Sequence, residues 1–155
     1  MKKLYLVLLF SIFTFSFVNS QDKGSGFGIM LGEPSGISLK QWLSQESAID
    51  IGIAYSFVQT SSFQVQLDYV IHNYNLLTVK QGKLPFYYGI GGRIKLKGNS
   101  SSDDANIGLR VPFGLDYQFP NDPVDIFLEI VPVVDFTPVT KLTFNGSVGV
   151  RYFFN

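Results

Sequence analysis

Hydrophobic and polar residues alternate with a period of two along most of the chain. The pattern is clearest in 141–155, KLTFNGSVGVRYFFN, where one face carries large apolar residues and the other carries small, polar or charged ones, with Phe153 as the only bulky exception. A β-strand places successive side chains on opposite faces. This segment is therefore predicted to be a strand that separates two different environments.

The same alternation predicts eight strands in the whole chain. In the clearest internal one, Ile49, Ile51 and Ile53 alternate with Asp50 and Gly52. The predicted strands are 26–32, 36–42, 48–58, 63–74, 84–97, 106–119, 124–136 and 141–155. Since no period of 3.6 residues persists over two helical turns, the chain is predicted to be all-β. Short links between consecutive strands predict an eight-stranded antiparallel up-and-down meander, which can close into a barrel.

Soluble and transmembrane β-barrels share this alternation, and three features of the strands distinguish between the two kinds. The polar face is rich in Gly, Ala and Ser and has few charges per strand, whereas a water-facing surface carries far more Lys and Glu. The apolar face has more large residues than the narrow lumen of eight strands could hold. The strands are also long enough to cross a bilayer at a tilt. We therefore expect a transmembrane β-barrel with its apolar face toward lipid, and not a soluble barrel of the lipocalin kind.

The N-terminus has the pattern of a cleaved secretion signal. Lys2 and Lys3 precede an apolar stretch at 4–18, and Val18 and Ser20 occupy the small-residue positions before a cleavage site. The alternative, a membrane-anchoring helix, is disfavoured because the apolar stretch is short and leads directly into polar QDKGSG. We expect a signal peptide at 1–20 and one barrel domain at 21–155, located in the bacterial outer membrane.

Composition narrows the class of protein further. The 155 residues correspond to one domain, and the absence of Cys excludes a disulfide framework. Charged residues make up only 15% of the chain, below the roughly 25% of ordinary soluble domains. Cleavage would leave ten basic residues against twelve acidic ones, so nothing points to a nucleic-acid partner.

Charges on the inward positions are expected to pair, because an isolated charge inside a narrow barrel is costly. The inward bases are Lys40, Arg93, Lys95, Arg110, Lys141 and Arg151. The inward acids are Asp50, Asp68, Asp116, Asp125, Glu129 and Asp135. Six bases meet six acids, which predicts a neutral, plugged and non-conducting lumen. Strand counting predicts an Arg110–Glu129 pair near mid-depth, with Asp125–Arg151 and Asp135–Lys141 on either side of it.

The stretches FGIMLGEPSGISLKQW, LPFYYGIGGRIKLK and VTKLTFNGSVGVRYFF carry a resemblance to a known class of protein. The chain resembles the small eight-stranded outer-membrane barrels of Gram-negative bacteria, the OmpA transmembrane-domain and OmpX type. Such barrels usually end on an aromatic residue that the assembly machinery reads, whereas Asn155 follows Phe154 here. The resemblance thus implies a C-terminal insertion signal shifted by one residue. Its residues would be Val148, Val150, Tyr152 and Phe154.

Catalysis has little support in the sequence. Some eight-stranded outer-membrane enzymes cleave lipid A acyl chains with a His and a Ser on one strand, but His72, the only His, is followed by Asn73 and Tyr74. Strand counting also puts His72 at the periplasmic end, whereas lipid A lies in the outer leaflet. With one His and no Cys, we expect neither a metal site nor a cofactor. We expect that the protein is not an enzyme.

Three functional classes remain open, all of them for a monomer in contact with membrane lipids and the outer-membrane assembly machinery. The first is a barrel with a structural or surface role. The second is an adhesin that holds a host or environmental ligand through the polar loop at 98–105, whose sequence is GNSSSDDA. The third is a lipid-modifying enzyme or a narrow channel. The sequence favours the first class and identifies no ligand.

Overall fold

The computed structural model describes residues 24–57, 61–98 and 105–154. The predicted signal peptide, most of the loop at 98–105 and Asn155 lie outside these residues. The described chain is all-β, and its strands are β1 (Ser25–Glu33), β2 (Ser35–Trp42), β3 (Ser47–Ser56), β4 (Ser62–Asn73), β5 (Phe86–Lys97), β6 (Ala105–Arg110), β7 (Phe113–Gln118), β8 (Val124–Asp135) and β9 (Lys141–Phe154). In the part of the chain that is described, no helix is long and apolar enough to cross a membrane.

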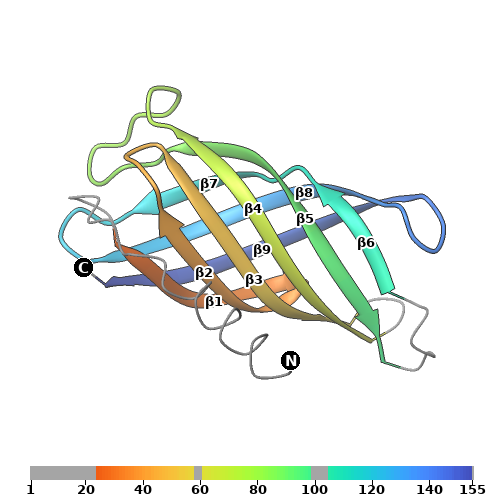
Figure 1. The fold of residues 1–155 in the computed structure, drawn as a ribbon. Helices are drawn as coiled ribbons and strands as arrows, with labels where there is room; N and C mark the ends of the chain where they lie inside the picture. The colour runs from red at the N-terminus through yellow and green to blue at the C-terminus, as the bar shows by residue number, and fades with distance from the viewer. Residues whose placement is uncertain (1–23, 58–60, 99–104, 155) are drawn as a thin grey trace, which may run out of the picture.

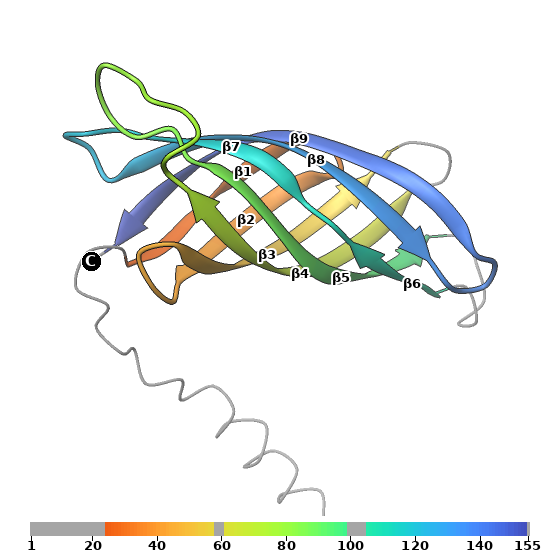
Figure 2. The ribbon, with the colours of Figure 1, turned by 90° about the horizontal axis from the view of Figure 1, so that it is seen from above.

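The strands form one antiparallel sheet that closes on itself (Figures 1 and 2). Apart from β6 and β7, which do not pair with each other, each strand pairs with its neighbour in the sequence, and β9 pairs with β1, which closes the ring. The segments β6 and β7 share one place between β5 and β8, so nine strands occupy eight positions in the ring. A closed ring leaves no unpaired sheet edge.

The structure corrects the predicted sixth strand, which is divided at Val111 and Pro112 into β6 and β7. Proline has no N–H to donate to a neighbouring strand, so it interrupts a ladder. The interruption keeps two backbone bonds, because Gly89 N donates to Pro112 O and Val111 N donates to Pro132 O, both at 3.0 Å. The other seven predicted strands correspond to β1–β5, β8 and β9, and none of their ends is displaced by more than two residues.

The two faces of the sheet have inverted polarity. Among the described residues, 33 large apolar side chains are exposed, while only nine apolar residues are buried. The buried set instead includes 17 polar or charged residues, four of which are the cations Lys40, Arg93, Arg110 and Arg151. Along β9, Val148 and Val150 are exposed and Ser147 and Arg151 are buried. The apolar faces of the strands therefore point out of the ring and the polar faces point into it.

Aromatic residues on the outward face lie toward both ends of the ring. At the end where the chain terminates, Phe27 is the cross-strand partner of Tyr152, and Tyr152 contacts Phe154 edge to face at 5.0 Å between ring centroids. At the opposite end, Tyr55 is the partner of Phe63. Aliphatic pairs such as Ile29–Val150 and Ile53–Val65 lie between these levels.

The connections differ between the two ends of the ring. Ser25 and Phe154 are cross-strand partners, so β1 begins where β9 ends. The same end carries the turn at 43–46, the loop at 74–85 and the turn at 119–123, of which the loop at 74–85 is the longest. That loop is tied to the sheet by Lys83, whose backbone exchanges two hydrogen bonds with Gln118, at 3.0 and 2.8 Å.

Candidate functional site

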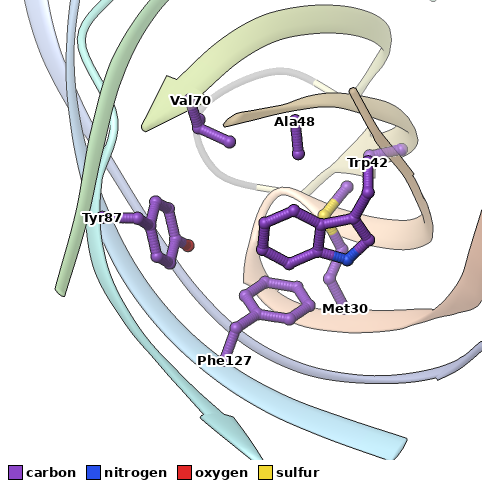
Figure 3. Close-up of a cluster of buried hydrophobic side chains, with 7 residues drawn as sticks. Met30, Trp42, Ala48, Val70, Tyr87 and Phe127 are labelled. Carbon is purple, nitrogen blue, oxygen red and sulfur yellow. The ribbon is translucent and has the colours of Figure 1, made fainter. Parts of the chain in front are cut away.

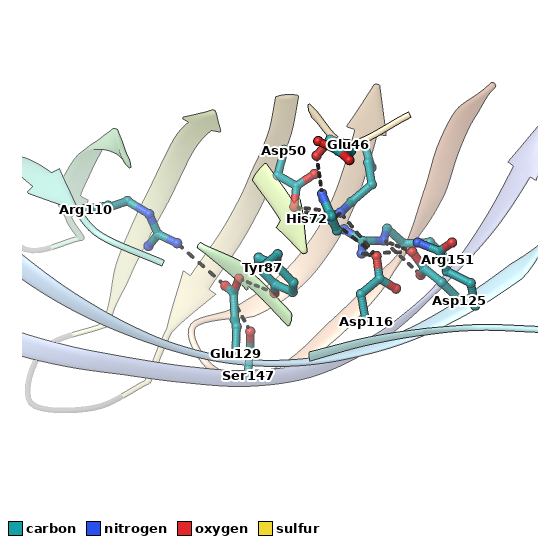
Figure 4. A network of polar contacts seen from close by, with 12 residues as sticks. Glu46, Asp50, His72, Tyr87, Arg110, Asp116, Asp125, Glu129, Ser147 and Arg151 are labelled. Carbon is teal, nitrogen blue, oxygen red and sulfur yellow. Dashed lines mark hydrogen bonds and ion pairs between the residues drawn. The ribbon is translucent and has the colours of Figure 1, made fainter. Parts of the chain in front are cut away.

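The interior of the ring holds most of the charged residues that the sequence placed there (Figure 4). Asp50 and Lys95 are only half-buried, and Lys141 is exposed at the rim. The remaining nine are buried: Lys40, Asp68, Arg93, Arg110, Asp116, Asp125, Glu129, Asp135 and Arg151. The interior is thus a polar core that runs along the axis of the ring, and its charges fall into three groups.

The first group lies near the end where the chain terminates, and Arg151 is its centre. Arg151 on β9 and Asp125 on β8 are cross-strand partners with 2.9 Å between Nη2 and Oδ2. The same guanidinium lies 3.4 Å from Asp50 and 3.7 Å from Asp116. Lys40 completes the group at 3.4 Å from Asp50 and 3.5 Å from Asp116. Two cations and three carboxylates therefore share one buried network.

His72 also belongs to this group. The sequence analysis did not place His72 among the interior charges. Its Nε2 lies 2.9 Å from Lys40 Nζ and 3.5 Å from Asp116 Oδ2, and its Nδ1 lies 3.2 Å from the backbone oxygen of Glu46. The signal in the sequence was its parity, because His72 shares the inward face of β4 with Asp68. Among the described residues, His72 therefore contacts both a carboxylate and an amine side chain.

An apolar cluster fills the interior beside this group (Figure 3). It consists of Met30, Trp42, Ala48, Ala54, Val70, Tyr87 and Phe127. Cations lie over its rings: Lys40 Nζ is 5.0 Å from the centre of the Trp42 ring, and Arg151 Cζ is 4.2 Å from that of Phe127. Such cation–π contacts, together with the carboxylates, stabilise the buried charges. Side chains thus occupy the space that a wide channel would need.

The second group is centred on Arg110, near the middle of the ring. Arg110 Nε donates to both carboxylate oxygens of Asp68, at 3.0 and 3.1 Å. Glu129, the partner predicted from strand counting, lies farther away, at 3.7 Å from Arg110 Nη2. Glu129 instead accepts hydrogen bonds from Tyr87 at 2.9 Å and from Ser147 at 3.4 Å. Asp68 is therefore the main partner of Arg110, and Glu129 is a secondary one.

The third group lies toward the opposite end, around Arg93. Its Nη2 and Nε donate to the two oxygens of Asp135, at 2.6 and 3.0 Å. Nη2 also donates to Thr143, and Nη1 to Asn145, both at 3.1 Å. The sequence had paired Asp135 with Lys141, which is its cross-strand neighbour. The bidentate contact with Arg93 was not foreseen, because Arg93 lies two strands away from Asp135.

Arg110–Asp68 and Arg93–Asp135 each join strands that are separated by one intervening strand, and a glycine on that strand makes the contact possible. Gly91 lies between Asp68 and Arg110 in the register, and Gly108 lies between Arg93 and Asp135. A Cβ on Gly91 would lie 2.6 Å from the Asp68 Cα, and a Cβ on Gly108 would collide with the Asp135 carboxylate. An inward glycine therefore lets two long side chains meet above it. The inward glycines of β5 and β6 were the signal in the sequence for this pairing.

Opposite charges are matched within the interior network. Its cations are held by carboxylates, and within the described ranges no group of three or more His, Asp or Glu side chains could hold a metal ion. The hydroxyl groups of Ser147 and Tyr87 donate hydrogen bonds to Glu129. Among the described side chains, this arrangement balances the buried charges.

Cavities lined by described residues lie at both ends of the ring. Two of them, of about 650 and 440 Å³, are at the end where the chain terminates, and Gly82 and Lys83 line both. Tyr74 lines the larger one, and burial raises the pKa of Tyr74 to about 12, so its phenol is neutral at physiological pH. A further cavity, of about 230 Å³, is at the opposite end and is lined by residues of β1, β5, β6, β8 and β9.

Two further sets of predicted residues lie outside the interior. Val148, Val150, Tyr152 and Phe154 share the exposed outward face of β9, so the face assigned to the insertion signal is accessible, and its role stays a prediction. The loop at 98–105 was the predicted ligand-binding segment, and its residues 99–104 are not among those described. The adhesin hypothesis therefore stays a prediction.

Comparisons with known proteins give one family and one similar structure. The family model described as "Protein of unknown function (DUF3996)" matches residues 18–154. No curated protein matches the sequence. The crystal structure of the N-terminal β-barrel domain of Pseudomonas aeruginosa OprF has a similar fold, with a TM-score of 0.65 over 84% of this chain and 96% of that one. Sequence identity is 14%, so the likeness concerns the fold, which is that of a β-barrel domain.

Proposed function

We propose that this chain, a member of the DUF3996 family, is a small integral outer-membrane protein: an eight-stranded transmembrane β-barrel with a plugged, charge-paired lumen. Its role would be structural, or that of a passive surface protein. The observation that carries the proposal is the inverted polarity of the ring, with apolar side chains outside and charged side chains inside. A soluble protein would expose this apolar face to water at a large free-energy cost.

The distribution of outward residues supports a membrane position. Aliphatic pairs such as Ile29–Val150 occupy the middle of the ring, and aromatic pairs such as Phe27–Tyr152 and Tyr55–Phe63 lie toward its ends. Outer-membrane barrels have the same arrangement, with an apolar band between two aromatic girdles. The β-barrel fold shared with the OprF domain is consistent with this environment.

The buried ion pairs support a plugged lumen. Arg151, Arg110 and Arg93 follow one another along the axis, and each contacts at least one carboxylate within 3.0 Å. Ions would have to displace these side chains in order to cross. The interior is therefore better suited to holding the barrel together than to conduction.

The positions of the two barrel ends support an orientation, although the loop at 74–85 is longer than a usual periplasmic turn. An even number of antiparallel strands brings both ends of a barrel to one side of the membrane, and a secreted barrel enters the outer membrane from the periplasm. In this protein, β1 begins and β9 ends together, at Ser25 and Phe154. We therefore assign this end, with the loop at 74–85, to the periplasm, and the end with Pro34 and the loop at 136–140 to the exterior.

Site-specific labelling tests the membrane position directly, because the chain has no Cys and each introduced Cys is unique. A fluorophore on Leu128→Cys, at an exposed outward position of β8, should be quenched by nitroxides carried on lipid chains. A fluorophore on Leu77→Cys, in the loop at 74–85, is the control and should respond instead to a water-soluble quencher. Recovery of the protein as a soluble periplasmic monomer without detergent would refute the proposal.

A further inference from the structure

The cavity of about 230 Å³ at the proposed outer end differs in charge from the other two. Four cationic and two anionic residues line it, and we name them together the basic mouth: Glu33, Arg93, Lys95, Lys97, Asp135 and Lys141. The larger cavities at the opposite end have no such surplus. One is lined by Glu46 and Lys83, and the other by Lys83, Asp122 and Asp125.

The two acids of the basic mouth are engaged within its walls. Asp135 accepts two hydrogen bonds from Arg93, at 2.6 and 3.0 Å, so this pair is neutral. Glu33 accepts a hydrogen bond from the Ser56 hydroxyl, and that hydroxyl accepts one from Lys95 at 3.3 Å. Lys97 and Lys141 add two more positive charges, one from β5 and one from β9. With four cationic and two anionic side chains, the described lining of the mouth therefore carries a net positive charge over a polar floor.

From this geometry we propose that the basic mouth binds the phosphate group of an anionic ligand, held chiefly by Lys97 and Lys141. The inference rests on the proposed membrane barrel and its orientation. Lysine binds phosphate as a mobile point charge with three N–H donors, and a surplus of lysines in a cavity attracts an oxyanion. A water molecule occupies about 30 Å³ of liquid, so 230 Å³ accommodates a phosphate group with part of its hydration shell.

The position of the mouth indicates where the phosphate could come from. Phe144 lines the same cavity and is exposed on the outward face of β9. Tyr55 and Phe63 mark the outward aromatic level at this end of the ring. Aromatic girdles lie at the level of lipid headgroups, so the mouth opens where lipid phosphates are found. A free phosphate-bearing solute shares this chemistry and is the second possible source.

Two measurements on the folded protein separate the sources. In dodecyl maltoside, which has no phosphate, inorganic phosphate is titrated and the backbone amide shifts of Lys97 and Lys141 are followed by NMR. In phosphatidylcholine nanodiscs with or without phosphatidic acid, the anionic lipid that stays bound is counted by native mass spectrometry. Binding in both measurements, or in either alone, supports the inference and identifies the lipid, the solute or their shared phosphate as the source.

Matched variants make the result specific to the mouth. Lys97→Gln and Lys141→Gln should each weaken binding by about fivefold, which is the effect of one cation near an anionic surface. Lys80→Gln, which removes an exposed cation from the loop at 74–85, should leave binding unchanged. No binding in either measurement, or an equal loss in Lys80→Gln, would overturn the inference.

Heat-modifiable migration of each variant on gels reports whether the barrel has folded. If the barrel folds in detergent and does not bind phosphate, the inferred phosphate site is wrong and the proposed function is unaffected. A chain that folds in water without detergent overturns both.

Discussion

Replacing Arg110 or Asp68 should reduce the stability of the protein strongly, because both residues are buried and each neutralises the other. Removing one partner of a buried pair leaves an uncompensated charge and costs about 3–5 kcal/mol. We expect Arg110→Ala and Asp68→Ala each to lower the free energy of unfolding by about that amount. The double variant should lose much less than the sum. Urea unfolding in lipid vesicles can be followed through Trp42, the single Trp.

The control for this cycle is Lys80→Ala, an exposed loop substitution that should change stability by less than about 0.5 kcal/mol. Glu129→Ala should couple more weakly to Arg110→Ala than Asp68→Ala does, because its carboxylate lies at 3.7 Å instead of 3.0 Å. Losses that add within about 0.5 kcal/mol for Arg110 and Asp68 would show that water, and not the pair, compensates these charges.

Two glycines on β9 provide a second test at the scale of single residues. A Cβ on inward Gly149 would lie 2.5 Å from the backbone oxygen of Ile29 and against the Phe127 ring. On outward Gly146, the nearest atom to a Cβ would be the Glu129 backbone oxygen, at 3.8 Å. Gly149→Ala should therefore destabilise the protein by about 1–3 kcal/mol through overpacking. Gly146→Ala should be close to neutral in the same urea unfolding measurement, and equal effects at the two sites would contradict the assigned faces.

At the scale of elements, β9 is the strand on which closure depends, because it pairs with both β8 and β1. Deleting residues 148–155 would remove its pairing with β1 from Leu31 to Ser25 and leave two edges unpaired. In lipid, each unpaired backbone group costs several kcal/mol. We expect the truncated chain to fail to insert and to be digested by protease added to vesicles, whereas removal of Asn155 alone should be tolerated. A truncated chain that inserts and resists protease would show that closure does not depend on this segment.

At the scale of the whole molecule, the proposed plugged lumen predicts no steady conductance. Three arginine-centred groups and the cluster of Trp42, Tyr87 and Phe127 occupy the space along the axis. Purified protein in planar bilayers should therefore show no stable single-channel steps, with insertion verified separately by protease resistance in the same lipids. Regular openings of the unmodified protein would contradict a plugged lumen.

The sequence predicted more of the fold than of the contacts within the site. Period-two alternation placed seven of the eight predicted strands within one or two residues of their observed ends, because burial on one face leaves a direct mark in the sequence. The break at Pro112 was missed, since a proline within an alternating run changes the ladder without changing the pattern. Inward parity also identified the buried charges, including Arg110 and Arg151.

The polarity of the two faces is what the sequence by itself determined, because each strand must present one face to each environment and its side chains record that choice. The partners of the charges were decided only by the tertiary structure. Arg93 reaches Asp135 across Gly108, and Arg110 reaches Asp68 across Gly91. Lys40, His72 and Asp116 come from three different strands. Such contacts depend on how the ring closes and on which intervening residues lack a side chain. The alternation within a single strand does not determine either of these features.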